Sequence, residues 1–202
     1  MSKKTLRISA RDFSIILGCN PYETAFELLE KKIENKHPFF GNKFTEHGNK
    51  YEKIAIEKYS ELTNNKVNNC NVLVHPNFDW ICGKPDGITE NNCILEVKCP
   101  WKKKEDELTM DNVPIHYWCQ VQVYMNILNT EIGHYVEYYK DKITDSEDFR
   151  FVPVIRDRNW WNLSINTIKN FYDEMLFYQE KGNLNNHPVR IANNLWENSL
   201  KK

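Results

Sequence analysis

The chain has 202 residues, of which 41% are hydrophobic and 27% charged, a composition typical of one globular domain with a substantial core. Its formal net charge of −1 excludes an overall basic field for nucleic acid, although a local basic channel is compatible with it. The six cysteines form no CxxC pair or zinc spacing, and no apolar run approaches the roughly 18 residues of a membrane span, so we expect an intracellular protein that is neither secreted nor membrane-bound.

The first third of the chain carries helical patterns. Ser9 is suited to cap a short helix, and Gly18 is suited to end it. The predicted helices cover residues 10–17, 24–32 and 45–62, with a loop over residues 35–42.

The middle of the chain is rich in β-formers that are separated by turn residues. The predicted strands cover residues 71–75, 80–84 and 93–98 and are expected to form an antiparallel meander. A helix over 113–128 follows, then a strand pair at 132–139 and 149–155, a long helix from Asp157 to about Lys181, and a short helix over 190–200. This order predicts an α/β fold with a central mixed β-sheet flanked by helices.

Two short segments, Lys84–Ile88 and Ile94–Pro100, contain the most informative residues. Side chains two positions apart on a strand point to the same face of the sheet, so Ile94, Glu96 and Lys98 project together. Leu95 and Val97 point to the opposite face. Pro85-Asp86-Gly87 reads as a tight turn or bulge, which presents the Asp86 carboxylate at a strand junction.

Two carboxylates and one ammonium in one place make a poor core and a good site for a hard metal ion. Mg²⁺ prefers oxygen ligands from one or two carboxylates and completes its shell with water and phosphate. A neighbouring lysine can position or deprotonate an attacking water. The pattern therefore favours metal-dependent phosphodiester hydrolysis, although spacing alone leaves a solvated strand face as the alternative.

The motifs resemble the PD-(D/E)xK nuclease superfamily, and more specifically its YqaJ-type viral recombinase branch, the lambda-exonuclease-like family. The matching pieces occur in order between residues 8 and 122: Ile8-Ser9-Ala10 with Leu17-Gly18 and Asn20-Pro21-Tyr22, then Gly48-Asn49-Lys50-Tyr51-Glu52, Pro85-Asp86-Gly87, Leu95-Glu96-Val97-Lys98-Cys99-Pro100 and Gln120-Val121-Gln122. The resemblance implies a restriction-endonuclease-like core at about 44–156 within a single nuclease domain over 1–202, followed by C-terminal helices over 157–200.

The resemblance also implies metal ligands. Asp86 and Glu96 would hold Mg²⁺ or Mn²⁺ together with the main-chain carbonyl of Val97. Glu52 would complete the shell of a second ion or hold its waters.

Other roles follow from the same resemblance. Lys98 would position and activate the water, and Gln120 would lie over the active site from the following helix. Ser9 and Arg11 occupy the region in which the family holds a 5′-phosphate.

The implied activity is that of a metal-dependent exonuclease that acts on linear duplex DNA ends, in the 5′ to 3′ direction, for recombination or end processing. The implied partners are double-stranded DNA ends, a single-strand annealing protein, and further copies of the chain in a trimer. Two alternatives stay open: a structure-selective or site-specific endonuclease of the same superfamily, and a non-catalytic DNA-binding protein. The source is expected to be a virus or phage, with the protein inside the host cell.

Overall fold

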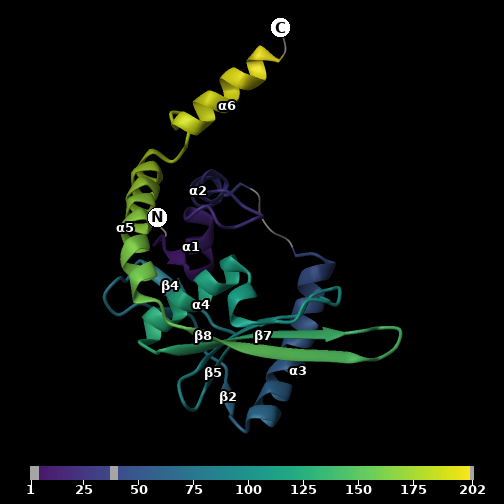
Figure 1. The fold of residues 1–202 in the computed structure, drawn as a ribbon. Coiled ribbons are helices and arrows are strands. Elements are labelled where there is room, and N and C mark those ends of the chain that lie inside the picture. Colours follow the sequence, from purple (N-terminus) through teal and green to yellow (C-terminus); the bar gives the residue numbers. More distant parts are fainter. Residues whose placement is uncertain (1–4, 37–40, 201–202) are drawn as a thin grey trace.

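The computed structural model describes residues 5–36 and 41–200, and the strands of this part form two mixed sheets (Figure 1). The larger sheet has the spatial order β2 (Val67–Asn68), β5 (Gly87–Thr89), β6 (Ile94–Lys98), β7 (Ile132–Lys140) and β8 (Glu147–Ile155). The smaller has the order β1 (Ile8–Ser9), β4 (Ile81–Gly83) and β3 (Leu73–Val74). The pairs β6–β7 and β1–β4 are parallel, and the other neighbours are antiparallel.

Polar caps begin several of the helices. The side chains of Thr24, Asn42 and Asp157 each accept a hydrogen bond from a main-chain N–H in the first turn that follows. The helices are α1 (Ala10–Ile16), α2 (Ala25–Glu34), α3 (Lys43–Thr63), α4 (Ile115–Leu128), α5 (Arg158–Lys181) and α6 (Pro188–Ser199), with a 3₁₀ turn at Met110–Asn112. Of the predicted loop over 35–42, residues 37–40 lie outside the described part.

Strand β6 divides the apolar side chains between two cores. Ile94 belongs to a large cluster that includes Val121 of α4, whereas Leu95 and Val97 belong to a smaller cluster that includes Ala55 of α3. The alternation predicted for this strand is therefore confirmed. It leaves the side chains of even-numbered residues on the α4 side of the sheet.

The predicted antiparallel meander over 71–98 is wrong. β3 and β4 do pair antiparallel, but β4 lies in the smaller sheet, and the antiparallel neighbour of β6 is the three-residue strand β5. Pro85 has no N–H to donate to a ladder, so the chain leaves β4 after Gly83 and resumes as β5 at Gly87, in the other sheet. This crossing between sheets places Asp86 beside β6.

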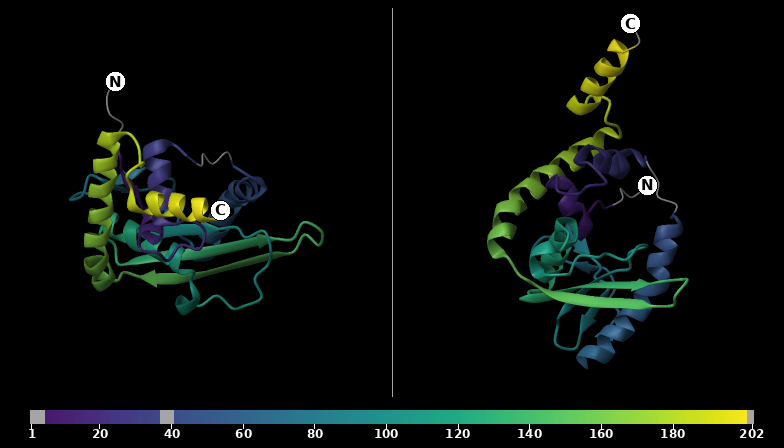
Figure 2. Two further views of the ribbon diagram at one scale, coloured as in Figure 1. Left: turned by 90° about the horizontal axis from the view of Figure 1, so that it is seen from above. Right: turned by 45° about the vertical axis from the view of Figure 1, so that its right-hand side comes forward.

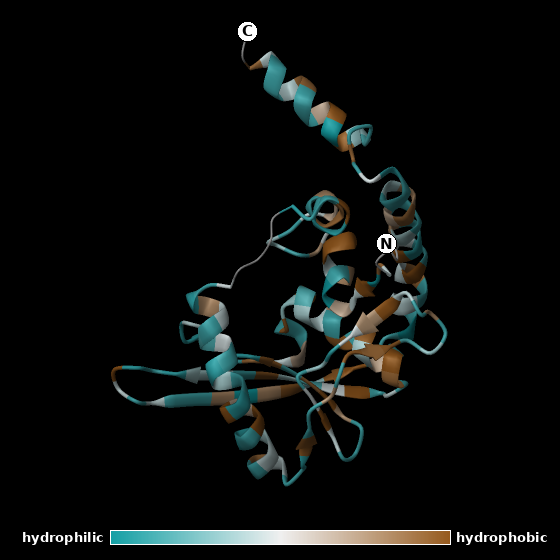
Figure 3. Cartoon of the chain, turned by 180° about the vertical axis from the view of Figure 1, so that it is seen from behind, coloured by the Kyte–Doolittle hydropathy of each residue, from teal (hydrophilic) through white to brown (hydrophobic). Residues whose placement is uncertain are grey.

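The C-terminal helix α6 extends away from the sheets (Figure 2). Its attachment includes Arg190, whose guanidinium binds the carboxylates of Glu30 and Glu34 on α2 at 2.5 Å each. Leu195 and Trp196 of α6 are exposed. Hydrophobic and hydrophilic residues alternate along this helix (Figure 3). Within residues 5–36 and 41–200, no helix combines the length and apolar character needed to cross a membrane.

Candidate functional site

Asp86 lies at the junction of the two sheets and is bound to the backbone of β6. Its main-chain N–H donates to the carbonyl of Leu95 at 3.1 Å, and its Oδ2 accepts from the N–H of Val97 at 2.7 Å. These two bonds fix the carboxylate against the strand that carries Glu96 and Lys98. The turn predicted at Pro85-Asp86-Gly87 therefore presents the acid as expected.

Glu96 and Lys98 point to the same side of β6 and form an ion pair. The Glu96 side chain is 0% exposed, and the Lys98 ammonium also lies 4.0 Å from Oδ2 of Asp86. The structure thus brings together the two carboxylates and the ammonium that the sequence singled out.

A hydrogen-bonded chain from α4 supports this cluster. Gln120 Nε2 donates to Glu96 Oε2 at 3.1 Å and lies 2.7 Å from the hydroxyl of Tyr124, which in turn donates to the carbonyl of Lys84 at 3.1 Å. A Cβ at Gly83 would lie 2.6 Å from the Tyr124 ring, so only glycine permits this approach. Gln120 thus contacts Glu96 from α4. Tyr124 lies one helical turn after Gln120 and extends the chain of hydrogen bonds to Lys84.

Burial changes the proton affinities of the ion pair. It raises the pKa of Glu96 to about 7, with the Lys98 ammonium opposing and the Asp86 carboxylate adding to the shift. For Lys98, burial alone would lower the pKa, but the Glu96 and Asp86 carboxylates outweigh it and the net shift is upward. Lys98 is therefore a cation at neutral pH, suited to donate hydrogen bonds and poorly suited to accept a proton.

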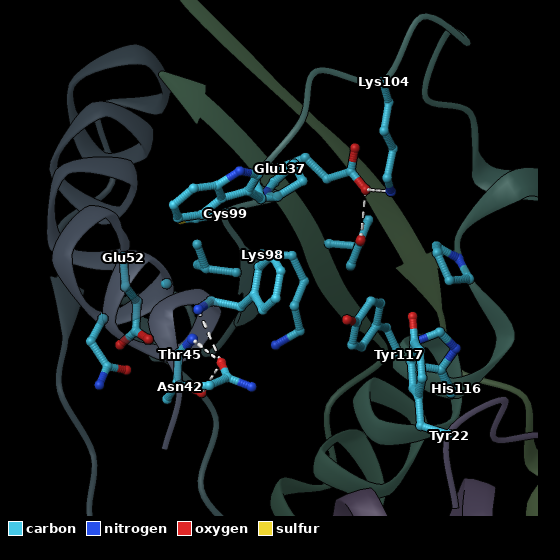
Figure 4. A pocket seen from close by; sticks show the side chains of 18 residues that line it. Tyr22, Asn42, Thr45, Glu52, Lys98, Cys99, Lys104, His116, Tyr117 and Glu137 are labelled. Atoms are coloured by element: carbon cyan, nitrogen blue, oxygen red, sulfur yellow. Dashed lines mark hydrogen bonds and ion pairs between the residues drawn. The ribbon is translucent and has the colours of Figure 1, made fainter. Parts of the chain in front are cut away.

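Lys98 lines a cavity of about 680 Å³ together with Glu52 (Figure 4), whereas its partner Glu96 is fully buried. Glu52 points into this space from α3. Its pKa is raised, first by burial and then by the negative charge of Asp86, which places the two carboxylates in the same electrostatic environment. Glu52, the third acid implied by the resemblance, therefore comes from helix α3, whereas Asp86 comes from a turn and Glu96 from a strand.

Three aromatic side chains form a wall of the cavity that the sequence did not indicate (Figure 4). Tyr117 lies under the Lys98 ammonium, 4.8 Å from ring centroid to Nζ. Tyr22 packs edge-on against His116 at 5.7 Å, although it is nearly a hundred residues away in the chain. Burial and then Lys98 lower the pKa of His116, so its ring is neutral near pH 7.

A second buried glutamate, Glu137 on β7, lies beside Lys98 in the strand register. Its carboxylate accepts from the hydroxyl of Tyr135 at 2.7 Å, pairs with Lys104, and pairs with Arg150 at 3.1 Å. Arg150 also donates to the carbonyl of Asp106 at 2.5 Å. These contacts hold the segment that follows β6 against the sheet.

Ser9 and Arg11 do not line the cavity that contains Lys98. They line a neighbouring hollow together with Arg7 and Lys32. The Ser9 N–H donates to Asp12 at 2.7 Å, and Arg11, an exposed side chain, lies 3.7 Å from Glu23. Arg11 is still close enough to His116 to contribute to the lowering of its pKa.

The donor set fits a hard divalent ion. Asp86, Glu96 and Glu52 would offer carboxylate oxygens to such an ion. The N–H of Val97, whose carbonyl is the further expected ligand, donates to the Asp86 carboxylate. In the described residues no three His, Cys, Asp or Glu side chains stand close enough to hold a metal by themselves. Mg²⁺ and Mn²⁺ accept one or two carboxylates with water and substrate oxygens, so an incomplete protein shell suits them.

Two solved structures share this fold. An alkaline exonuclease from Laribacter hongkongensis matches with a TM-score of 0.68 at 18% identity, over 87% of this chain and 90% of that one. A phage-related exonuclease from Haemophilus somnus matches with a TM-score of 0.64 at 18% identity, over 88% and 95%. Both are exonucleases with a restriction-endonuclease-like fold, which confirms the fold class predicted here.

Sequence comparison finds longer relatives. A protein of Acanthamoeba polyphaga mimivirus is 28% identical over 163 residues, covering 74% of this chain and 30% of that protein. YqaJ of Bacillus subtilis is 30% identical over 127 residues, covering 61% of this chain and 40% of YqaJ. The chain thus spans less than half the length of either relative. The family model of the YqaJ-like viral recombinase domain matches residues 2–132, and the chain belongs to this family.

Proposed function

We propose that the protein is a Mg²⁺- or Mn²⁺-dependent DNA exonuclease that hydrolyses phosphodiester bonds at linear duplex ends. The observation that carries this proposal is the contact of Lys98, which lines an open cavity together with Glu52, with two carboxylates, those of Glu96 and Asp86. Family membership and the shared fold of two exonucleases support it.

The roles of the residues follow from their positions. Asp86, Glu96, Glu52 and the carbonyl of Val97 would hold the metal, which when bound would stabilise the negative charge that develops on the scissile phosphate. Lys98, a cation here, would orient the attacking water by donating a hydrogen bond. Gln120 would hold the Glu96 carboxylate in place.

The direction and the partners belong to the same proposal. Digestion would run 5′ to 3′, with Ser9 and Arg11 binding the terminal phosphate in their hollow beside the cavity. The protein would act inside the cell as a homo-oligomer, a trimer by family resemblance, together with a single-strand annealing protein. Residues 1–202 would form one nuclease domain.

The test is a digest with two substrates. The protein is incubated with Mg²⁺ and a linear duplex that carries a 5′-phosphate on one strand only, with covalently closed plasmid alongside, and EDTA in a parallel reaction. Loss of the phosphorylated strand alone, with intact plasmid and no cleavage in EDTA, is expected. Nicked plasmid would replace the proposal with an endonuclease, and absence of cleavage with either Mg²⁺ or Mn²⁺ would favour a non-catalytic DNA-binding protein.

A further inference from the structure

Two exposed aromatic side chains stand in the lining of the active-site cavity. Phe44 is 53% exposed and Trp101 is 38% exposed, and both line the cavity that also contains Glu52 and Lys98. Their rings meet edge to face, with centroids 5.5 Å apart and an interplanar angle of 76°. We call this pair the aromatic rim.

Both members of the rim are connected to the site by short pieces of regular chain. Phe44, Gly48 and Glu52 are spaced four residues apart on α3, so they lie on one face of the helix, and Phe44 is roughly 12 Å along the axis from Glu52. Trp101 follows Lys98 by three residues. One segment therefore connects Glu52 to the exposed ring of Phe44, and a second connects Lys98 to the exposed ring of Trp101.

Gly48 leaves space between the rim and the site. It also lines the cavity, and a Cβ built on it would meet no atom within 4 Å. Glycine within a helix costs about 1 kcal/mol relative to alanine. The track along α3 between Phe44 and Glu52 is thus open enough for a polymer backbone to approach closely.

The surroundings of the rim are cationic. Lys142 Nζ lies 3.9 Å from the centroid of the Trp101 ring, and Lys43 Nζ lies 5.3 Å from that of Phe44. The inner side of Trp101 rests on His47, whose Nε2 is hydrogen-bonded to the carbonyl of Pro100 at 3.3 Å. The ring is therefore held in place from inside, and the Lys142 and Lys43 ammonium groups lie over it, where they are exchangeable for a base.

We propose that the aromatic rim is a stacking platform for an unpaired base of the DNA strand whose phosphate enters the active site. Exposed aromatic rings next to lysines bind single-stranded nucleic acid without sequence preference, because every base has a π-face and every phosphate a charge. A protein partner would need an apolar surface with few charges, which the lysines around the rim do not provide. The inference rests on the proposed nuclease function and adds to it the position at which the substrate strand is separated and held.

The test uses fluorescence of 2-aminopurine placed at successive unpaired positions next to the junction of a forked duplex, with Ca²⁺ in place of Mg²⁺ to prevent cleavage. Wild-type protein is expected to quench the probe at one position. Phe44→Leu and Trp101→Leu, which keep apolar volume but remove the ring, are expected to lose that quenching and to weaken binding about tenfold. Phe44→Tyr, which keeps a ring, should restore both.

The matched control is Phe177→Leu. Phe177 on α5 is 51% exposed and has its own lysine, Lys181, 4.3 Å from its ring, but it does not line the cavity. Its loss should leave quenching and affinity unchanged. If Phe44→Leu and Trp101→Leu also quench and bind like wild type, the platform does not exist, and a change in their elution volume instead would assign the rim to protein association.

The two proposals fail separately. A wild-type protein that cleaves linear DNA in Mg²⁺ while the rim variants behave normally retains the nuclease function and loses the platform. A wild-type protein that quenches the probe through Phe44 but cleaves nothing retains the platform and loses the nuclease function.

Discussion

Two buried glutamates on neighbouring strands, Glu96 and Glu137, face the same side of the sheet but have different surroundings. The Glu137 carboxylate has three donors from the protein: a tyrosine hydroxyl, Lys104 and Arg150. Glu96 has one amide and the Lys98 ammonium, and burial raises its pKa to about 7. We therefore expect Glu137, whose charge the protein balances although it lines the cavity, to serve the fold, and Glu96, whose charge is balanced only in part, to bind the proposed metal.

The difference between the two glutamates is tested most strongly by removing the lysine paired with each of them, Lys98 and Lys104. Lys98→Ala is expected to lower the cleavage rate on the order of 10³-fold while DNA binding is kept, because a charged donor at the reacting phosphate is lost. Lys104→Ala removes the lysine of the other glutamate, and we expect less than a tenfold change. Steady-state cleavage rates and a binding titration measure both. A Lys98→Ala protein that cuts at the wild-type rate would remove Lys98 from the mechanism.

The pH dependence of stability should separate the two acids next. Folding raises the pKa of Glu96 from its ordinary value of 4.5 to about 7, so the stabilising contribution is full below pH 4.5 and is lost as pH rises through 7. Without divalent ions, wild-type stability should gain at most about 3 kcal/mol from this group between pH 8 and 5. Denaturant titrations of wild type and Glu96→Gln at both pH values test this. An equal change in the free energy of unfolding between the two pH values in both proteins would contradict it.

Loss of charge at Glu137 should destabilise the fold. Glu137→Gln leaves Arg150 and Lys104 without their carboxylate, which we expect to cost about 2 kcal/mol, or about 4–8 °C in Tm for a chain of this length. Glu147→Gln on the same hairpin is the control, because Glu147 is more exposed and its ion pairs with lysine stabilise the fold less.

The acids of the proposed metal site should behave in the opposite way. Glu96→Gln and Asp86→Asn should leave the Tm of the metal-free protein unchanged or higher and should weaken Mg²⁺ binding, which calorimetry would measure.

The smallest effect is expected at Arg11. Arg11→Ala should reduce the preference for 5′-phosphorylated over 5′-hydroxyl ends by less than about tenfold, because its exposed guanidinium would make a hydrogen bond that solvent weakens. Arg158→Ala, an exposed arginine paired with Glu131 instead, is the control. The ratio of initial rates on the two ends is the measurement. A ratio that Arg11→Ala does not change would remove Arg11 from phosphate recognition.

The features predicted from sequence are those encoded by a local pattern. Period-two alternation placed Glu96 and Lys98 on one face of β6, and short polar caps and turns located the ends of most helices. β5 was not predicted because a strand of three residues, one of them glycine, shows too little alternation to be recognised. The antiparallel neighbour of β6 was therefore predicted wrongly as well.

The surroundings of the site could not be predicted because they depend on distant segments. Tyr22 reaches His116, and Lys104 and Arg150 reach Glu137, only after the chain has folded. In sequence, Glu137 looks like Glu96: an acid on a strand between apolar neighbours. The aromatic rim likewise joins residues 44 and 101, which are far apart in the chain.

Because the side chains of β6 alternate between two faces, the function of this strand depends on its exact register in the sheet. A slip of one residue would turn Leu95 and Val97 toward the cavity and would drive Glu96 into the apolar cluster around Ala55. Such a chain would lose its second core and the residues proposed to be catalytic in a single event. Hydrolytic activity would then report directly on correct strand registration, so an assay for cleavage would also serve as a test for misfolded protein in any preparation.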